Sequence, residues 1–130
     1  MNEIKVVRHI IIGAIICSLY ILLSAFGAHG LEEKITPNQL KTFNTGLRYL
    51  IIHGLGIILI SLVYLLLKKY NPWVYYLIYL GMLFFSLSLV IHALKDIIGF
   101  NVNLFAFIAP IGGLCYASSW ILLALVLRRK

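Results

Sequence analysis

The chain has 130 residues, of which 62% are hydrophobic and 12% are charged, and its formal net charge is +7. This composition leaves too few polar residues for a separate soluble domain. The positive charge invites a nucleic-acid-binding interpretation, but the basic residues lie in short segments between long apolar runs. We therefore expect no nucleic-acid partner, and the composition favours an integral membrane protein.

Four long segments carry no formal charge: residues 10–28, 49–67, 73–94 and 97–127. An α-helix needs roughly 20 apolar residues to cross the hydrocarbon core of a bilayer, and each run is about that long or longer. The runs are apolar on every face, whereas the strands of a membrane barrel alternate between apolar and polar residues. We predict an all-α integral membrane protein with one domain, residues 1–130, built as a compact bundle of four transmembrane helices. The expected spans are about 8–28, 46–67, 73–94 and 104–127.

The basic residues are unevenly divided between the two ends of this predicted bundle. Threading four spans in order puts seven of them at the end that carries both termini: Lys5, Arg8, Lys68, Lys69, Arg128, Arg129 and Lys130. The other end has four, diluted by three acidic residues: Lys34, Lys41, Arg48, Lys95, Glu32, Glu33 and Asp96. Because basic residues concentrate in cytoplasmic loops, we expect a multi-pass protein of the cytoplasmic membrane. Both termini should lie in the cytoplasm, and membrane lipids should be its partners.

The second span is preceded by the signature of a helix start. Thr36 suits the capping position, Pro37 the first helical position, and Gln39 completes a capping box. An unbroken helix from Pro37 to Leu67 would be about 46 Å long, well beyond a hydrocarbon core of about 30 Å. We therefore predict a short interfacial helix that bends near Gly46 into the span proper.

The fourth span contains Pro110, followed by Gly112 and Gly113. Proline removes one backbone hydrogen bond, and the two glycines loosen the next turn. We expect a kink or a break at this point. It would free the carbonyl of Ala106 to accept a hydrogen bond from another helix.

Polar side chains follow one face of the second span. Thr45, Tyr49 and His53 recur every four residues and form one stripe, with Arg48 beside them and His29 at the outer end of the first span. An ionisable group within a span is costly, so each needs a partner. We expect His53 to face the bundle interior, bonded to the first or fourth helix, with Tyr49 lining the same outward-facing cavity. The simpler alternative is that each polar residue only satisfies one interhelical or interfacial bond.

Three segments in chain order resemble one known family. Residues 24–31 read SAFGAHGL, residues 43–53 read FNTGLRYLIIH, and residues 110–113 read PIGG and are followed by Trp120. They resemble the bacterial membrane proteins of domain of unknown function 423, whose pattern is roughly A-F-G-A-H-G-L, T-G-x-x-Y-x-x-x-H and P-x-G-G. The resemblance covers nearly the whole chain. It implies a small four-span protein of the cytoplasmic membrane and names no activity.

The family motifs and the polar stripe together define a candidate ligand pocket: His29, Thr45, Arg48, Tyr49, His53, Pro110, Gly112 and Gly113. All except Arg48 match the family pattern, as does Gly46. Two positions depart from it, because Leu87 and Ser119 stand where relatives often have glycine. These larger side chains put close helix packing there in doubt.

Three functions fit these observations. The first is a non-enzymatic structural or accessory membrane protein, with a second copy or another membrane protein as partner. The alternative is binding or transport of a small ligand or lipid, of unknown identity, through the pocket around His53. A His-dependent metal or haem protein has less support, because His29 and His53 lie at different depths and no His-x3-His spacing occurs. We predict no catalytic residue, no metal site and no cofactor.

Overall fold

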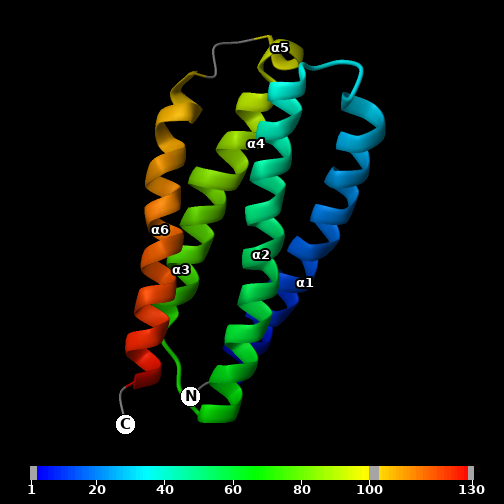
Figure 1. The fold of residues 1–130 in the computed structure, drawn as a ribbon. Coiled ribbons are helices and arrows are strands. Elements are labelled where there is room, and N and C mark those ends of the chain that lie inside the picture. The colour runs from blue at the N-terminus through cyan, green and yellow to red at the C-terminus, as the bar shows by residue number, and fades with distance from the viewer. Residues whose placement is uncertain (1–2, 100–102, 129–130) are drawn as a thin grey trace.

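The computed structural model describes residues 3–99 and 103–128, and all the regular structure in this part of the chain is helical. Four long helical segments run up and down, with both ends of the chain at the same end of the bundle (Figure 1). The bounds are α1 Glu3–Phe26, η1 Gly27–Leu31, α2 Pro37–Leu67, α3 Pro72–Gly81, η2 Met82–Leu87, α4 Ser88–Ala93, α5 Lys95–Ile98 and α6 Asn103–Arg128. The π-helical segment η1 extends α1, and η2 joins α3 to α4. The predicted all-α fold with four spans is confirmed.

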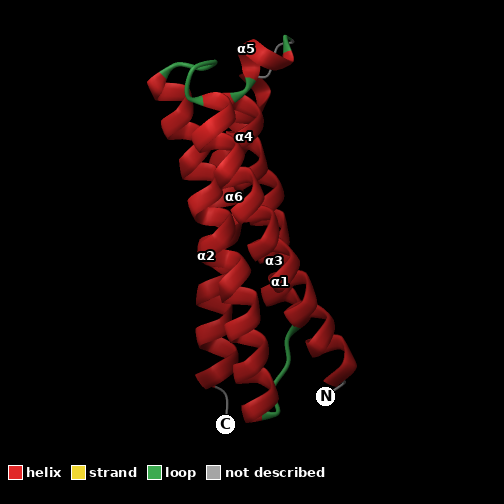
Figure 2. Ribbon diagram, turned by 90° about the vertical axis from the view of Figure 1, so that its right-hand side faces the viewer, coloured by secondary structure: helices red, strands yellow, loops and turns green. Residues whose placement is uncertain are grey.

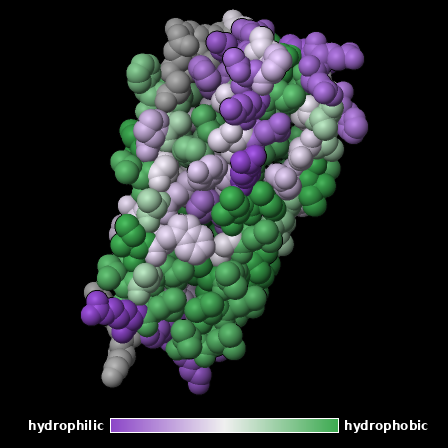
Figure 3. Space-filling model, viewed as in Figure 1, coloured by the Kyte–Doolittle hydropathy of each residue, from purple (hydrophilic) through white to green (hydrophobic). Residues whose placement is uncertain are grey.

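The outer surface of the helices is apolar. Four helical segments are long and apolar enough to cross a membrane: Glu3–Leu31, Pro37–Leu67, Pro72–Ala93 and Phe107–Arg128. Large side chains such as Leu22, Leu66 and Phe107 point outward. Figure 3 shows a broad hydrophobic region over the lower part of one face, with hydrophilic side chains gathered at its upper end. Such a surface suits contact with lipid and is far larger than the apolar patches of soluble proteins.

The start of α2 follows the predicted capping chemistry but not the predicted bend. The Gln39 N–H donates to Thr36 Oγ1 at 3.3 Å, and the Thr36 N–H donates to Gln39 Oε1 at 2.8 Å. The separate interfacial helix is wrong, because α2 runs as one helix from Pro37 to Leu67 (Figure 1). Its first turns bury Phe43 and Leu47 between η1 and α4 instead of lying along the membrane surface. The packing of these two side chains thus determines the course of α2, and the comparison of helix length with membrane thickness predicted it wrongly.

Two apolar clusters fill the bundle at different heights. One lies among α2, α3, η2 and α6 in the half nearer the termini, and it includes Ile57, Tyr64, Val74, Ile78 and Leu123. The other lies near the opposite end and is formed by Leu31, Phe43, Leu47 and Ala93. Figure 2 shows α1 splaying away from α2 and α6 toward its N-terminal end. Nearer its middle, α1 packs closely on α2, where a Cβ atom on Gly13 would lie 2.8 Å from the Gly54 oxygen.

Pro110 lies inside α6, which continues through it from Asn103 to Arg128. A break is therefore absent, and the alternative of a kink at this point stays a prediction. The ring of Pro110 is exposed on the outside of the bundle, whereas Gly112 is buried. The proline thus costs one backbone bond on the outer face while the glycine packs on the inner face.

Candidate functional site

His53 is held in the centre of the bundle by two hydrogen bonds. Its side chain is 3% exposed. Nδ1 lies 2.8 Å from the backbone oxygen of Tyr49, and the indole Nε1 of Trp120 on α6 donates to Nε2 at 3.2 Å. Since a carbonyl only accepts and an indole N–H only donates, these contacts assign a neutral ring with its proton on Nδ1. The expectation that His53 faces inward and bonds the fourth helix is confirmed, but its partner there is Trp120 and not the Ala106 carbonyl.

Aromatic rings fill the space around His53. The Tyr116 ring stacks on the imidazole with centroids 3.5 Å apart and planes 13° apart. Tyr49 lies 6.2 Å from His53 and 4.5 Å from Phe85, between centroids. The Tyr116 hydroxyl is hydrogen-bonded to Ser86 Oγ at 2.9 Å. His53, Tyr49, Phe85, Ser86, Tyr116 and Trp120, which we call the His53 cluster, therefore join α2, η2 and α6.

Glycines bring the helix backbones together around this cluster. A Cβ atom on Gly112 would lie 2.3 Å from the Phe85 nitrogen and 2.6 Å from the Phe84 carbonyl carbon. A Cβ atom on Gly46 would lie 2.8 Å from the Ser86 oxygen. Only glycine permits such close approach of backbones in a membrane bundle. The motif glycines therefore position η2 against both α2 and α6.

The two departures from the family pattern leave this packing intact. Leu87 is exposed and points out of the η2–α6 contact. Ser119 is fully buried, and its hydroxyl donates to the Tyr116 oxygen one turn earlier at 2.7 Å. Close packing is therefore kept at Ser119, whereas Leu87 lines a hollow on the side of η2 that faces α1.

Other candidate residues lie away from the His53 cluster. Thr45 donates its hydroxyl to the Lys41 oxygen of its own helix at 2.9 Å. Arg48 is exposed and lines a separate hollow with Tyr20 and Ser24 of α1. His29 is exposed on η1. The structure thus brings together Tyr49, His53 and Gly112, but it does not place His29, Arg48 and Thr45 with them. A ligand-binding role for these residues stays a prediction.

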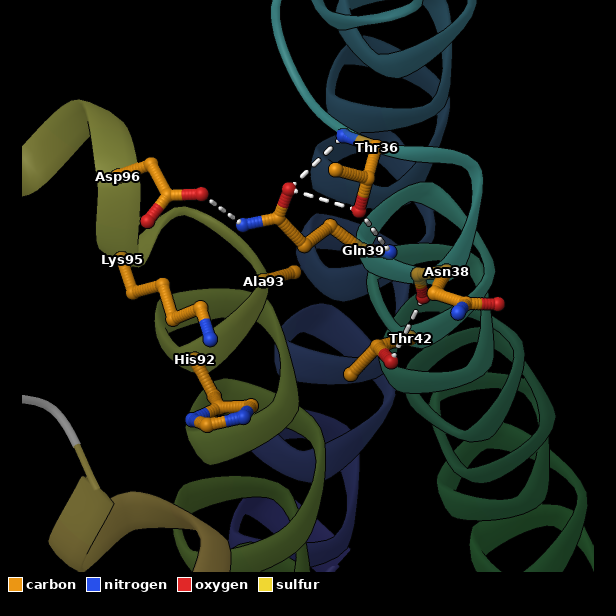
Figure 4. A pocket seen from close by; sticks show the side chains of 8 residues that line it. All are labelled: Thr36, Asn38, Gln39, Thr42, His92, Ala93, Lys95 and Asp96. Carbon is orange, nitrogen blue, oxygen red and sulfur yellow. Dashed lines mark hydrogen bonds between the residues drawn. The ribbon is translucent and has the colours of Figure 1, made fainter.

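A second site that the sequence did not indicate lies at the end of the bundle opposite the termini (Figure 4). This outer pocket has a volume of about 270 Å³ and lies between the start of α2 and the α4–α5 junction. Its lining residues are Thr36, Asn38, Gln39, Thr42, His92, Ala93, Lys95 and Asp96. They offer a cation, an anion, an imidazole and several neutral polar groups, a combination that suits a small polar or zwitterionic molecule.

One hydrogen-bond chain builds the roof of the outer pocket. Gln39 accepts from Thr36 through Oε1 and donates to Asp96 Oδ2 through Nε2 at 2.7 Å. His92 Nδ1 is buried, and among the described residues it has no hydrogen-bond partner. A buried polar atom without a partner costs about 1–3 kcal/mol, and this nitrogen is closed to solvent although the His92 side chain lines the pocket. The sequence signal was weak, because Gln39 and Asp96 are far apart in the chain.

Within residues 3–99 and 103–128, no three His, Cys, Asp or Glu side chains lie close enough to hold a metal ion together. His53 and His92 belong to the His53 cluster and the outer pocket respectively, and His29 is exposed on η1. These three histidines therefore lie at separate places in the fold.

Several bacterial proteins are similar to this chain along most of its length. A UPF0382 membrane protein of Staphylococcus haemolyticus is 36% identical over 114 residues, which cover 88% of this chain and 89% of the relative. The UPF0382 membrane protein YwdK of Bacillus subtilis is 34% identical over 119 residues, covering 88% and 90%. The UPF0382 inner membrane protein YgdD of Escherichia coli is 32% identical over 127 residues, covering 93% and 92%. No solved structure matches.

Residues 23–113 match the family described as "Protein of unknown function (DUF423)". The matched segment contains the AFGAHGL segment, the stripe from Thr45 to His53 and the Pro-x-Gly-Gly turn of α6. Of the His53 cluster, the matched segment contains Tyr49, His53, Phe85 and Ser86, whereas Tyr116 and Trp120 lie beyond it. The chain therefore belongs to the DUF423 family of membrane proteins.

Proposed function

We propose that this protein is a non-enzymatic structural or accessory protein of the cytoplasmic membrane, and that its intramembrane polar residues bond helices together. The observation that carries the proposal is that both nitrogens and one face of the His53 ring already have partners within the protein. Nδ1 is bonded to Tyr49, Nε2 is bonded to Trp120, and one face stacks on Tyr116. A ring engaged in this way has no free nitrogen for a substrate or a proton transfer.

A double-mutant cycle between His53 and Trp120 tests this role. His53→Phe and Trp120→Phe each remove one partner of the α2–α6 bond while keeping a ring in place. Measured interhelical bonds of this kind average about 0.6 kcal/mol and reach about 1.7 kcal/mol. We expect a coupling free energy in that range for unfolding in detergent. Independent effects of the two substitutions would contradict a structural role for the bond.

A second candidate function, small-ligand binding, is favoured by the outer pocket, whose lining combines the His92 side chain with the charged Lys95 and Asp96. We propose a polar or zwitterionic ligand there, in place of one around His53. A thermal-shift titration with glycine, compared between the native protein and His92→Phe, tests the idea, because a ligand that binds only the folded state raises its stability. Stabilisation of both proteins alike, or of neither, would contradict ligand binding at His92.

We also propose that both termini lie in the cytoplasm. The described residues at their end include Lys5, Arg8, Lys68, Lys69 and Arg128. The opposite end has four basic residues and three acidic ones: Lys34, Lys41, Arg48, Lys95, Glu32, Glu33 and Asp96. Arg129 and Lys130 lie outside the described residues. A reporter fused after Lys130 should work if it requires the cytoplasm and fail if it requires export, and the reverse result would overturn this orientation.

A further inference from the structure

Two hollows lie along the seam between α1 and α3. The first has a volume of about 360 Å³ and lies at the end of the bundle that carries the termini. Lys5 and Arg8 of α1 and Tyr76 of α3 line it. The second has a volume of about 380 Å³, lies deeper in the membrane and is lined by apolar residues such as Leu19 and Leu83. One hollow is therefore cationic and the other is apolar.

Helical spacing aligns the two hollows along one seam of the bundle. The α1 residues that line them recur at intervals of three or four and so share one helix face: Arg8, Ile12, Ile16, Leu19 and Leu23. The opposite wall follows the same spacing through Tyr76, Tyr79, Leu83 and Leu87. From Arg8 to Leu23 the helix rises about 22 Å, more than half of a hydrocarbon core about 30 Å thick. We call this feature the α1–α3 groove.

The His9 side chain lies between the α1 wall and the α3 wall of the groove. It marks the boundary between the cationic part and the apolar part. Its ring stacks on Tyr75 with centroids 3.7 Å apart and hydrogen-bonds the Tyr79 hydroxyl at 2.6 Å. Its second nitrogen lies 3.5 Å from the Tyr70 hydroxyl. The ring therefore ties α1 to α3 through side chains and leaves the groove open on either side of it.

The charges at the mouth of the groove are free to meet an anion. Lys5 and Arg8 are exposed and lie three residues apart on one face of α1. Within the described residues, neither side chain forms an ion pair with the nearby Glu3 or with any other carboxylate. The exposed Trp73 and Tyr76 belong to the aromatic belt that marks the headgroup level. The mouth thus offers positive charge at the depth where lipid phosphates lie.

We propose that the α1–α3 groove binds one anionic phospholipid, with its phosphate between Lys5 and Arg8 and an acyl chain along Leu19 and Leu83. A site that is cationic at one end and apolar along the rest of its length is complementary to an amphiphile. A free phosphate ion would contact only the cationic mouth of the groove and leave its apolar part empty. With the termini in the cytoplasm, as proposed above, the lipid comes from the leaflet whose anionic surface attracts basic residues.

Native mass spectrometry of the protein released from nanodiscs of equal phosphatidylglycerol and phosphatidylcholine tests the charged end. The native protein should retain phosphatidylglycerol preferentially. Each basic residue near an anionic surface contributes about 1 kcal/mol, or about fivefold, so K5Q/R8Q should lower this preference roughly 25-fold. The control K34Q/K41Q removes the same charge at the opposite end and should keep the preference. Equal losses in both variants would overturn the site.

The apolar end is tested by filling it. Leu19→Trp places a bulky ring in the groove, and Ile21→Trp makes the same change at an exposed position outside its lining. The first variant should lose bound phosphatidylglycerol and the second should keep it. Both positions are exposed, so neither change disturbs the core. Full retention by Leu19→Trp, or displacement of the lipid by inorganic phosphate alone, would show an ion site at the mouth and overturn the lipid assignment.

Discussion

The α3–α6 seam and the α1–α3 seam are built from equally apolar helices, yet one is closed and the other is open. At the closed seam, a Cβ atom on Gly81 would lie 2.4 Å from the Tyr116 ring, and Gly112 lies against the backbone of η2. At the open seam, large side chains such as Leu19 and Leu83 face each other across a hollow of about 380 Å³. Small residues, and not apolar character, distinguish the closed seam from the open one.

The sharpest way to break the closed seam is Gly112→Ala. The added Cβ would meet backbone atoms of Phe84 and Phe85, which have no rotamer by which to move aside. We expect this change to lower the free energy of unfolding by about 3 kcal/mol, the upper end for overpacked sites. Denaturation of the purified protein in mixed detergent micelles measures it.

Gly113→Ala is the matched control. The nearest atoms to a Cβ at this position belong to the Phe85 ring at 3.6 Å, an ordinary contact. We expect no loss of stability, and alanine has the better helix propensity by about 1 kcal/mol. Equal destabilisation by the two neighbouring substitutions would contradict contact with η2 as the cause of the loss at Gly112.

A pair of apolar truncations contrasts the two seams directly. Ile78 of α3 is 0% exposed in the closed core, whereas Leu83 of η2 is 50% exposed along the groove. Ile78→Ala leaves a cavity and should cost about 2 kcal/mol, whereas Leu83→Ala should cost under about 0.5 kcal/mol because lipid replaces the lost methyl groups. The same unfolding assay compares them. A larger loss from Leu83→Ala would mean that the α1–α3 seam is closed in the membrane.

The smallest expected effect concerns one bond inside the closed core. Ser61 Oγ of α2 is 2.9 Å from the Tyr75 hydroxyl of α3 and donates to the Ile57 oxygen at 2.7 Å. Tyr75→Phe removes the interhelical bond, while Ser61 keeps its bond to Ile57. We expect a loss of about 0.6 kcal/mol in unfolding free energy. A loss above about 2 kcal/mol would show that the hydroxyl supports more than this single contact.

The sequence was sufficient to predict the elements, because their signals are local. Charge-free runs predicted the four spans, and Thr36 with Gln39 predicted the start of α2. The bend near Gly46 was wrong because it rested on helix length alone. Instead of bending, α2 continues as one helix that is longer than the average hydrocarbon core, because its first turns are held by the buried contacts of Phe43 and Leu47.

The candidate site was predictable only in part. The cost of a buried imidazole indicated that His53 faces inward, but the partner Trp120 depends on how α6 is rotated against α2, which periodicity does not reveal. The outer pocket depends in the same way on where the α4–α5 junction meets the start of α2. Gln39 and Asp96 become neighbours only through that packing.

The central claim is that the His53 ring bonds helices together. The tautomer of His53 tests it most directly, because it reports whether both ring nitrogens are held by the protein. Solid-state ¹⁵N NMR of histidine-labelled protein in bilayers distinguishes the two ring nitrogens, and the His53→Asn spectrum identifies the signals of His53. The account predicts a neutral ring at neutral pH, with Nδ1 protonated and Nε2 hydrogen-bonded as an acceptor from Trp120. A ring protonated at Nε2, or an Nε2 signal unchanged by Trp120→Phe, would contradict it.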